Sequence, residues 1–193
     1  MRYRIIFILA FLVFITEFTL SQRIAETFRH FLGFTLDEDS LSAVQSKFGC
    51  GKIIEKGDAG GYEASISYYI KKQNIIISFI STELGGGKYI EGYHLFKISP
   101  DSNINYPKIT LSQFDTLNIG GLYIGMPLTK FKNIIGEKNI VIEYNRFSFE
   151  YYGKEKIPES KYPNIDYDVM VSGEGLFEEG ILSELNIWIA RTN

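Results

Sequence analysis

The sequence predicts an α+β fold made of two tandem repeats, each a short helical segment packed on an antiparallel sheet of about four strands. Three observations lead to this prediction. A short amphipathic segment occurs twice, each copy precedes segments in which apolar and polar residues alternate, and the turns between those segments are short. Alternation is typical of half-buried strands, and short connections between neighbouring strands indicate antiparallel pairing.

The clearer helical segment lies within residues 120–136, GGLYIGMPLTKFKNIIG. Pro127 suits the first helical position, and Gly136 suits the end because glycine adopts a left-handed backbone at little cost. Between them lies an apolar stripe at helical spacing: Leu128, Phe131, Ile134 and Ile135. A helix this short is marginal alone in water, so we expect the following strands to support it.

An earlier segment, residues 32–49, repeats this pattern in altered form as LGFTLDEDSLSAVQSKFG. Thr35 and Glu38 are spaced as a capping box, which predicts the start of this helix. Four residues have the same spacings as Leu128, Phe131, Ile135 and Gly136 in the later segment: Leu41, Val44, Phe48 and Gly49. The match predicts an internal duplication.

Segments of alternating or continuous apolar character follow each helix and predict the strands. After the first helix they cover residues 62–71, 75–80 and 93–98; after the second they cover 140–144, 146–152, 166–171 and 184–190. A polar stretch with two prolines separates the two sets. We therefore predict a first repeat at 22–100, a linker at 101–119 with a short strand at 109–111, and a second repeat at 120–193.

The first 21 residues have the layout of a secretory signal peptide, with Arg2 and Arg4 before an apolar run at 5–15. That run is shorter than the roughly 20 apolar residues of a spanning helix, so we predict cleavage after Ser21 and an exported, periplasmic or secreted protein. An uncleaved membrane anchor remains the alternative. Only in that case would a membrane be a partner.

Composition excludes several classes of function. The net charge is −3, and no Lys/Arg cluster is present in the sequence, which argues against binding to nucleic acid or to an anionic membrane surface. The single cysteine, Cys50, has no second cysteine in the chain with which to form a disulfide. The sequence predicts folding by hydrophobic burial, with Cys50 free to pair with another chain.

The motif of an apolar residue, glycine and methionine that begins at Ile124, the helix it opens and the strands behind it resemble the β-lactamase inhibitory protein family. The same local motif is similar to that of the small lipoprotein of the outer-membrane β-barrel assembly machine. The resemblance covers the pattern of residues 31–190 and implies a tandem-repeat fold. Phe34 stands in place of the first repeat's methionine, and the family's disulfide or lipid-attached cysteines are absent. No functional residue is carried over.

Catalysis, cofactors and metals find little support in the sequence, so we predict a protein that is not an enzyme. Cys50 and His94 are a conceivable nucleophile and base, but Cys50 follows the end of the first helix, where the dipole disfavours a thiolate. His30 and His94 lack neighbouring ligands at metal spacing. The glycines before Lys88 lack the spacing and the Ser or Thr of a phosphate-binding loop.

The aromatic residues of the second repeat suggest a binding face instead. If Phe147, Phe149 and Tyr151 face the helix, their neighbours along the strand face away. The sequence therefore predicts a protein-binding face that includes Tyr144, Arg146, Tyr152 and Trp188. The alternative, that the linker or the other repeat covers these rings, stays open. The expected function is an exported, inhibitor-like or interaction module; the second possibility is an envelope scaffold or assembly accessory anchored by its N-terminus.

Overall fold

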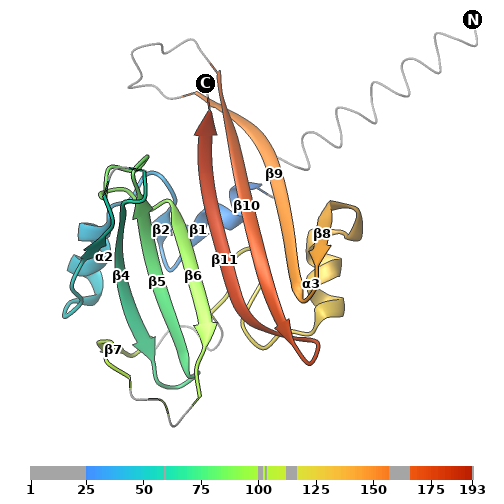
Figure 1. Ribbon diagram of the computed structural model, residues 1–193, viewed down its shortest axis with the longest axis horizontal. Coiled ribbons are helices and arrows are strands. Elements are labelled where there is room, and N and C mark those ends of the chain that lie inside the picture. Colours follow the sequence, from blue (N-terminus) through green and yellow to red (C-terminus); the bar gives the residue numbers. More distant parts are fainter. Residues whose placement is uncertain are drawn as a thin grey trace, which may run out of the picture.

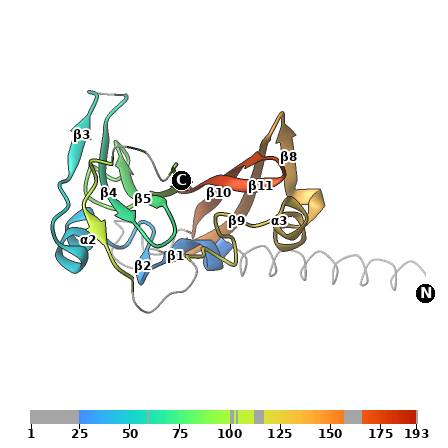
Figure 2. The same ribbon diagram turned by 90° about the horizontal axis from the view of Figure 1, so that it is seen from below.

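The described part of the protein forms one large sheet with the described helices gathered on one side (Figures 1 and 2). This architecture comes from a computed structural model that describes residues 25–58, 60–99, 102, 104–111, 117–156 and 166–192. Within these residues the fold is α+β, and nine strands make up the main sheet, which is almost entirely antiparallel. The predicted fold class is confirmed at this level. The predicted signal peptide lies outside the described residues.

The helices and strands follow the chain in a simple order. Residues 25–29 are helical, and the two short strands β1 (His30–Phe31) and β2 (Phe34–Thr35) pair with each other. The helices are α2 (Leu41–Phe48), α3 (Leu128–Ile135) and the 3-10 turn η1 (Glu137–Asn139). The main sheet contains β3 (Ile54–Lys56), β4 (Glu63–Ile70), β5 (Ile75–Thr82), β6 (Gly92–Lys97), β7 (Lys108–Ile109), β8 (Ile140–Glu143), β9 (Arg146–Lys156), β10 (Asp166–Glu178) and β11 (Ile181–Thr192).

The order across the main sheet is β3-β4-β5-β6-β11-β10-β9-β8, with β7 pairing in parallel beside β4. Strands β3 to β6 come from the first half of the chain and β8 to β11 from the second. The two halves join where β6 pairs with β11, in a register that runs from Gly92 opposite Trp188 to Phe96 opposite Glu184. Figure 1 shows this junction at the middle of the sheet.

Both principal helices begin differently from the prediction. Ser40 is the N-cap of α2 and its hydroxyl accepts a hydrogen bond from the N–H of Ala43 at 3.2 Å, so the predicted capping box at Thr35 and Glu38 was wrong. Asp39, rather than Glu38, accepts from the N–H of Thr35. Pro127 is the extended N-cap of α3 rather than its first helical residue. The helix ends at Gly136, as predicted.

The core lies between the helices and one face of the sheet. Alternate residues of the strands point into it, and Phe131 and Ile135 of α3 and Leu41 and Val44 of α2 are buried there. Residues 25–31 join the two halves of the core: the ring of Phe28 packs 5.3 Å from that of Phe149, and the ring of Phe31 packs 5.3 Å from that of Tyr93. This segment therefore contacts both halves.

Strand lengths also differ from the prediction. Strands β9 and β10 extend well beyond the predicted segments and pair along their length, from Leu176 opposite Arg146 to Asp166 opposite Lys156. Pairing between neighbouring strands extends them beyond the segments in which apolar and polar residues alternate, so the alternation predicts strands that are too short. In the predicted linker, β7 forms one residue earlier than expected. The predicted domain boundaries themselves remain predictions.

Candidate protein-binding face

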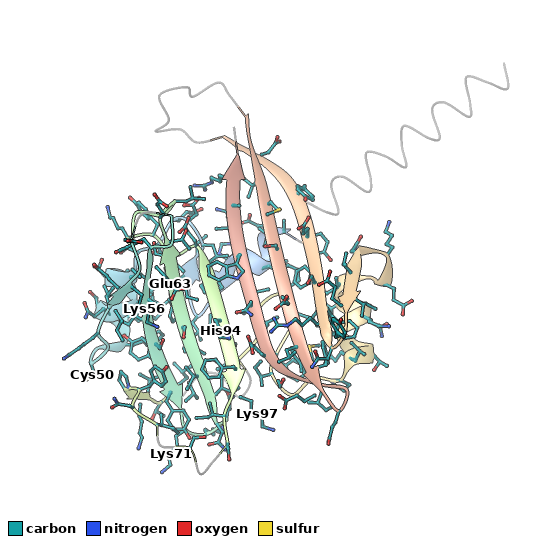
Figure 3. All side chains as sticks on the ribbon, viewed as in Figure 1. Cys50, Lys56, Glu63, Lys71, His94 and Lys97 are labelled. Carbon is teal, nitrogen blue, oxygen red and sulfur yellow. The ribbon has the colours of Figure 1, made fainter. Side chains whose placement is uncertain are left out.

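The side of the sheet away from α2 and α3, which we call the open face, carries a separate set of side chains. Strand parity places on it Arg146, Ser148, Glu150, Tyr152, Met170, Ser172, Glu174, Glu184, Asn186, Trp188, His94, Phe96, Ser67 and Ser78. Figure 2 shows α2 and α3 together on the opposite side of the sheet. Figure 3 looks onto the open face, where His94 is labelled on β6.

Trp188 occupies the middle of the open face beside the junction of the two halves. It pairs in register with Gly92, and a Cβ atom built on Gly92 would lie only 2.4 Å from Cε3 of the indole. The ring therefore packs directly over the glycine backbone and is half-buried rather than fully exposed. Only glycine leaves room for this arrangement, so the position of the ring is set by a residue of the other half.

A row of polar side chains crosses the sheet next to Trp188. Cross-strand register aligns Ser148, Glu174, Asn186, His94, Ser78 and Ser67 in this order. The imidazole of His94 lies 3.1 Å from the carboxylate of Glu184, and the amide of Asn186 donates to the same carboxylate at 3.2 Å. Ser67 and Ser78 share a hydrogen bond of 2.8 Å. The open face is thus polar at its centre, with several groups able to exchange hydrogen bonds with a partner.

Apolar side chains lie to one side of this polar row. Phe96 packs against His94 with ring centroids 4.8 Å apart, and Tyr69, Ile76 and Ile80 are buried on this face although they lie outside the main core. A shallow depression of about 260 Å³ lies on the other side, among Ser148, Glu150, Ser172, Glu174, Asn186 and Trp188. The open face therefore combines a group of buried apolar side chains with a shallow depression lined mainly by polar residues.

Three of the four predicted binding residues lie on the open face, and Tyr144 does not. Arg146 is half-exposed and forms an ion pair with Glu174 on the neighbouring strand, while Tyr152 is 55% exposed and donates its hydroxyl hydrogen to Glu150. Trp188 lies two strands away from both. Tyr144 stands apart in the β8–β9 turn, fully exposed and with a φ of 59°, a left-handed conformation that is costly for a tyrosine.

Several residues of the open face were missing from the predicted set. Glu174, His94 and Phe96 contribute charge, hydrogen bonds and aromatic surface next to the predicted residues. Strand parity in the sequence could have placed each of them on the outer side of its own strand. It could not show that β6 and β11 are neighbours, because that pairing joins residues almost a hundred positions apart.

The chemistry of His94 depends on its burial. Burial lowers the pKa of His94 below the ordinary value of 6.5, while the carboxylate of Glu184 opposes this change without reversing it. Its side chain keeps 27% of its exposure, and an imidazole with a lowered pKa stays neutral at pH 7. A neutral His94 can both donate and accept a hydrogen bond.

The described residues do not form the thiol–histidine pair, the phosphate-binding loop or the metal site that were weighed in the sequence. Cys50 lies at the outer edge of the first half, away from His94 on β6 (Figure 3). Residues 83–88, which include the glycines before Lys88, form turns between β5 and β6, and no helix follows them. Among the described residues, no group of three or more His, Cys, Asp or Glu side chains is arranged to hold a metal ion.

Comparison with family models, curated proteins and solved structures finds no match for this chain. None of the helices in the described part of the chain is both long and apolar enough to span a bilayer.

Proposed function

We propose that this protein is an exported, non-enzymatic module that binds another protein through the open face of its sheet. The observation that carries the proposal is the face itself: a broad surface, opposite the described helices, in which Trp188, Tyr152, Arg146 and Phe96 lie among hydrogen-bonding side chains. Tryptophan, tyrosine and arginine dominate the binding energy of protein interfaces. The depression of about 260 Å³ is smaller than most ligand pockets, which favours a macromolecular partner.

We further propose that the chain is a tandem repeat of one helix followed by four strands. The strand order supports this, because β3-β4-β5-β6 from the outer edge to the centre matches β8-β9-β10-β11 from the other edge to the centre. Each set follows a helix of eight residues that ends before a glycine. Two repeats joined edge to edge give an interface about twice as wide as either could supply, a property consistent with the resemblance to the inhibitory protein family.

Site-directed photo-crosslinking tests the face rather than merely the existence of a partner. A benzophenone side chain would be placed at Ser172, on the open face, and in a matched variant at Thr129, exposed on α3. We expect crosslinks to a discrete protein from Ser172 and none from Thr129 in the native host. Crosslinks from Thr129 alone, or none from Ser172, would contradict binding through the open face.

After crosslinking identifies a partner, titration of the purified proteins gives the affinity. Replacement of Ser172 by Arg would insert a bulky charge into the centre of the face, and Thr129→Arg would add the same charge to the opposite side. The proposal expects the first substitution to weaken binding by at least tenfold and the second to leave it unchanged. Equal effects would indicate general electrostatics rather than a specific face.

A further inference from the structure

The outer edge of β4 is paired at both of its ends but not in the middle. Near one end, Ser65 pairs with Ile54 of β3; near the other, Tyr69 pairs with Lys108 of β7. The N–H of Tyr69 donates to the carbonyl of Pro107 at 2.9 Å, which shows that Tyr69 directs its backbone groups toward this edge. Two short strands thus cover the edge and leave a break between them.

Ser67 lies at that break. Because backbone groups two residues apart on a strand point to the same neighbour, the N–H and C=O of Ser67 also point outward from this edge. Its pairing with Ser78 on the other side is then the type without backbone hydrogen bonds, consistent with the close contact of the two hydroxyls. In the portion of the chain that the structure describes, no strand residue pairs with Ser67 at the outer edge.

A cavity of about 510 Å³ occupies the break and is within the usual size range of ligand pockets. The described residues that line it are Cys50, Lys52, Ile54, Ser67, Ile104, Asn105, Tyr106 and Pro107, and among these Lys52 is the only charged side chain. If β3 continued in register, Lys52 would lie opposite Ser67, but the strand begins only at Ile54. The chain leaves the sheet at the point where one more pair could have formed.

The wall of the cavity is held in place by contacts with the core. A Cβ atom on Gly51 would lie 2.5 Å from the hydroxyl oxygen of Tyr68, so only glycine permits the chain to cross this ring. The side-chain amide of Gln45 donates to the carbonyl of Gly51 at 2.7 Å, and Cys50 has a φ of 49°. These contacts hold Gly51 against side chains of β4 but outside its backbone ladder, and the exposed Cys50 lines the cavity.

We propose that this cavity binds an extended, acidic segment of a partner polypeptide. The segment would pair its backbone with the N–H and C=O of Ser67, as in strand addition to a sheet edge, and would place a carboxylate beside Lys52. Ile54, Ile104 and Pro107 would contact the apolar side chains next to that carboxylate. The site uses the backbone of Ser67 at the sheet edge, whereas the open face includes the side chain of Ser67.

Hydrogen exchange of the free protein tests the break itself. The amide of Ser67 should exchange much faster than those of Ser65 and Tyr69, although all three lie within the same strand, because no described residue pairs with the backbone of Ser67 at the outer edge. Exchange of Ser67 as slow as that of its two neighbours would show that the edge is already closed, and the proposal would fail.

Binding can be measured with Cys50 as a reporter, since the chain has no other cysteine. The probe is the capped peptide acetyl-Thr-Val-Glu-Val-Thr-amide, and the reagent is the uncharged N-ethylmaleimide. When the peptide is present at four times its Kd, alkylation of Cys50 should slow about fivefold, because only the unoccupied protein reacts. The Ser67 amide should become protected from exchange at the same peptide concentration.

Three controls distinguish this site from non-specific protection. The same peptide with Lys in place of Glu, and the Glu peptide with its backbone N-methylated, should give little protection. Lys52→Gln should raise the Kd of the Glu peptide about threefold to fivefold, the range of an exposed ion pair worth up to roughly 1 kcal/mol. An unchanged alkylation rate at millimolar Glu peptide, or equal protection by all three peptides, would overturn the proposal.

Discussion

The indole of Trp188 lies over Gly92, and these two residues belong to opposite halves of the chain. Their contact forms part of the junction between β6 and β11, the pairing that makes one sheet out of two sets of strands. The same contact holds the largest aromatic side chain of the open face in a fixed orientation. The junction and the proposed binding face therefore depend on each other.

Gly92→Ala should disturb this contact directly. The added Cβ would lie 2.4 Å from the ring, closer than any real contact, so the indole must move. We expect a change in the fluorescence of the single tryptophan and a loss of about 1–3 kcal/mol in unfolding free energy. Gly61→Ala is a matched control, because its added Cβ would meet nothing closer than 3.9 Å. Identical spectra for Gly92→Ala and the parent protein would contradict the packing.

Phe131→Ala should be among the most destabilising substitutions in α3. Phe131 is fully buried and its ring contacts those of Phe147, Phe149 and Phe177. Its truncation should cost about 3–5 kcal/mol in denaturant unfolding, since a buried cavity would remain. Lys130→Ala, at the neighbouring exposed position, should cost less than about 0.5 kcal/mol. A loss below roughly 1 kcal/mol for Phe131→Ala would make the helix peripheral to the core.

His94 should make the stability depend on pH between about pH 5 and pH 7. Burial lowers the pKa of His94 in the folded protein below 6.5, so the unfolded chain binds a proton more readily in this range. Acidification should therefore decrease the free energy of unfolding, and His94→Gln should reduce that decrease. His30→Gln, at an exposed position, is the control. If both variants lose stability with the same slope as the parent, His94 is not responsible.

Tyr152→Ala should weaken binding of the crosslinked partner by on the order of 2 kcal/mol, about thirtyfold, while leaving the melting temperature nearly unchanged. Its ring is 55% exposed, and truncation leaves no core cavity. Tyr144→Ala tests whether the β8–β9 turn belongs to the same interface. Unfolding of Tyr152→Ala would assign the ring a structural role and remove the main support for its part in binding.

The N-terminal prediction can be tested by intact-mass measurement on protein from the native host. Cleavage after Ser21 would leave a chain that begins at Gln22. A mature protein that retains residues 1–20 would instead favour the anchored scaffold. The Ser172 crosslinking experiment is independent of this result, because it reports the binding face rather than the means of attachment.

The sequence by itself determined the local features of this protein. The apolar stripe of α3, the glycine at its end and the inward parity of Phe147, Phe149 and Tyr151 all agree with the structure. Such patterns repeat every two to four residues, because they reflect which side of one element must be buried. The same parity placed Arg146 and Tyr152 on the outer side of β9.

Only the tertiary structure decided which elements are neighbours. It placed Phe28 against Phe149, brought Trp188 over Gly92 and left Ser67 between two short strands. It also gave the capping of α2 to Ser40, since the backbone around Thr35 pairs in β2 instead. Contacts of this kind join residues far apart in the chain, and their stability depends on packing against the whole core. Local periodicity does not show which distant segments pair, so the sequence predicted only part of the open face, and its continuation onto β6 and the edge cavity were found in the folded protein.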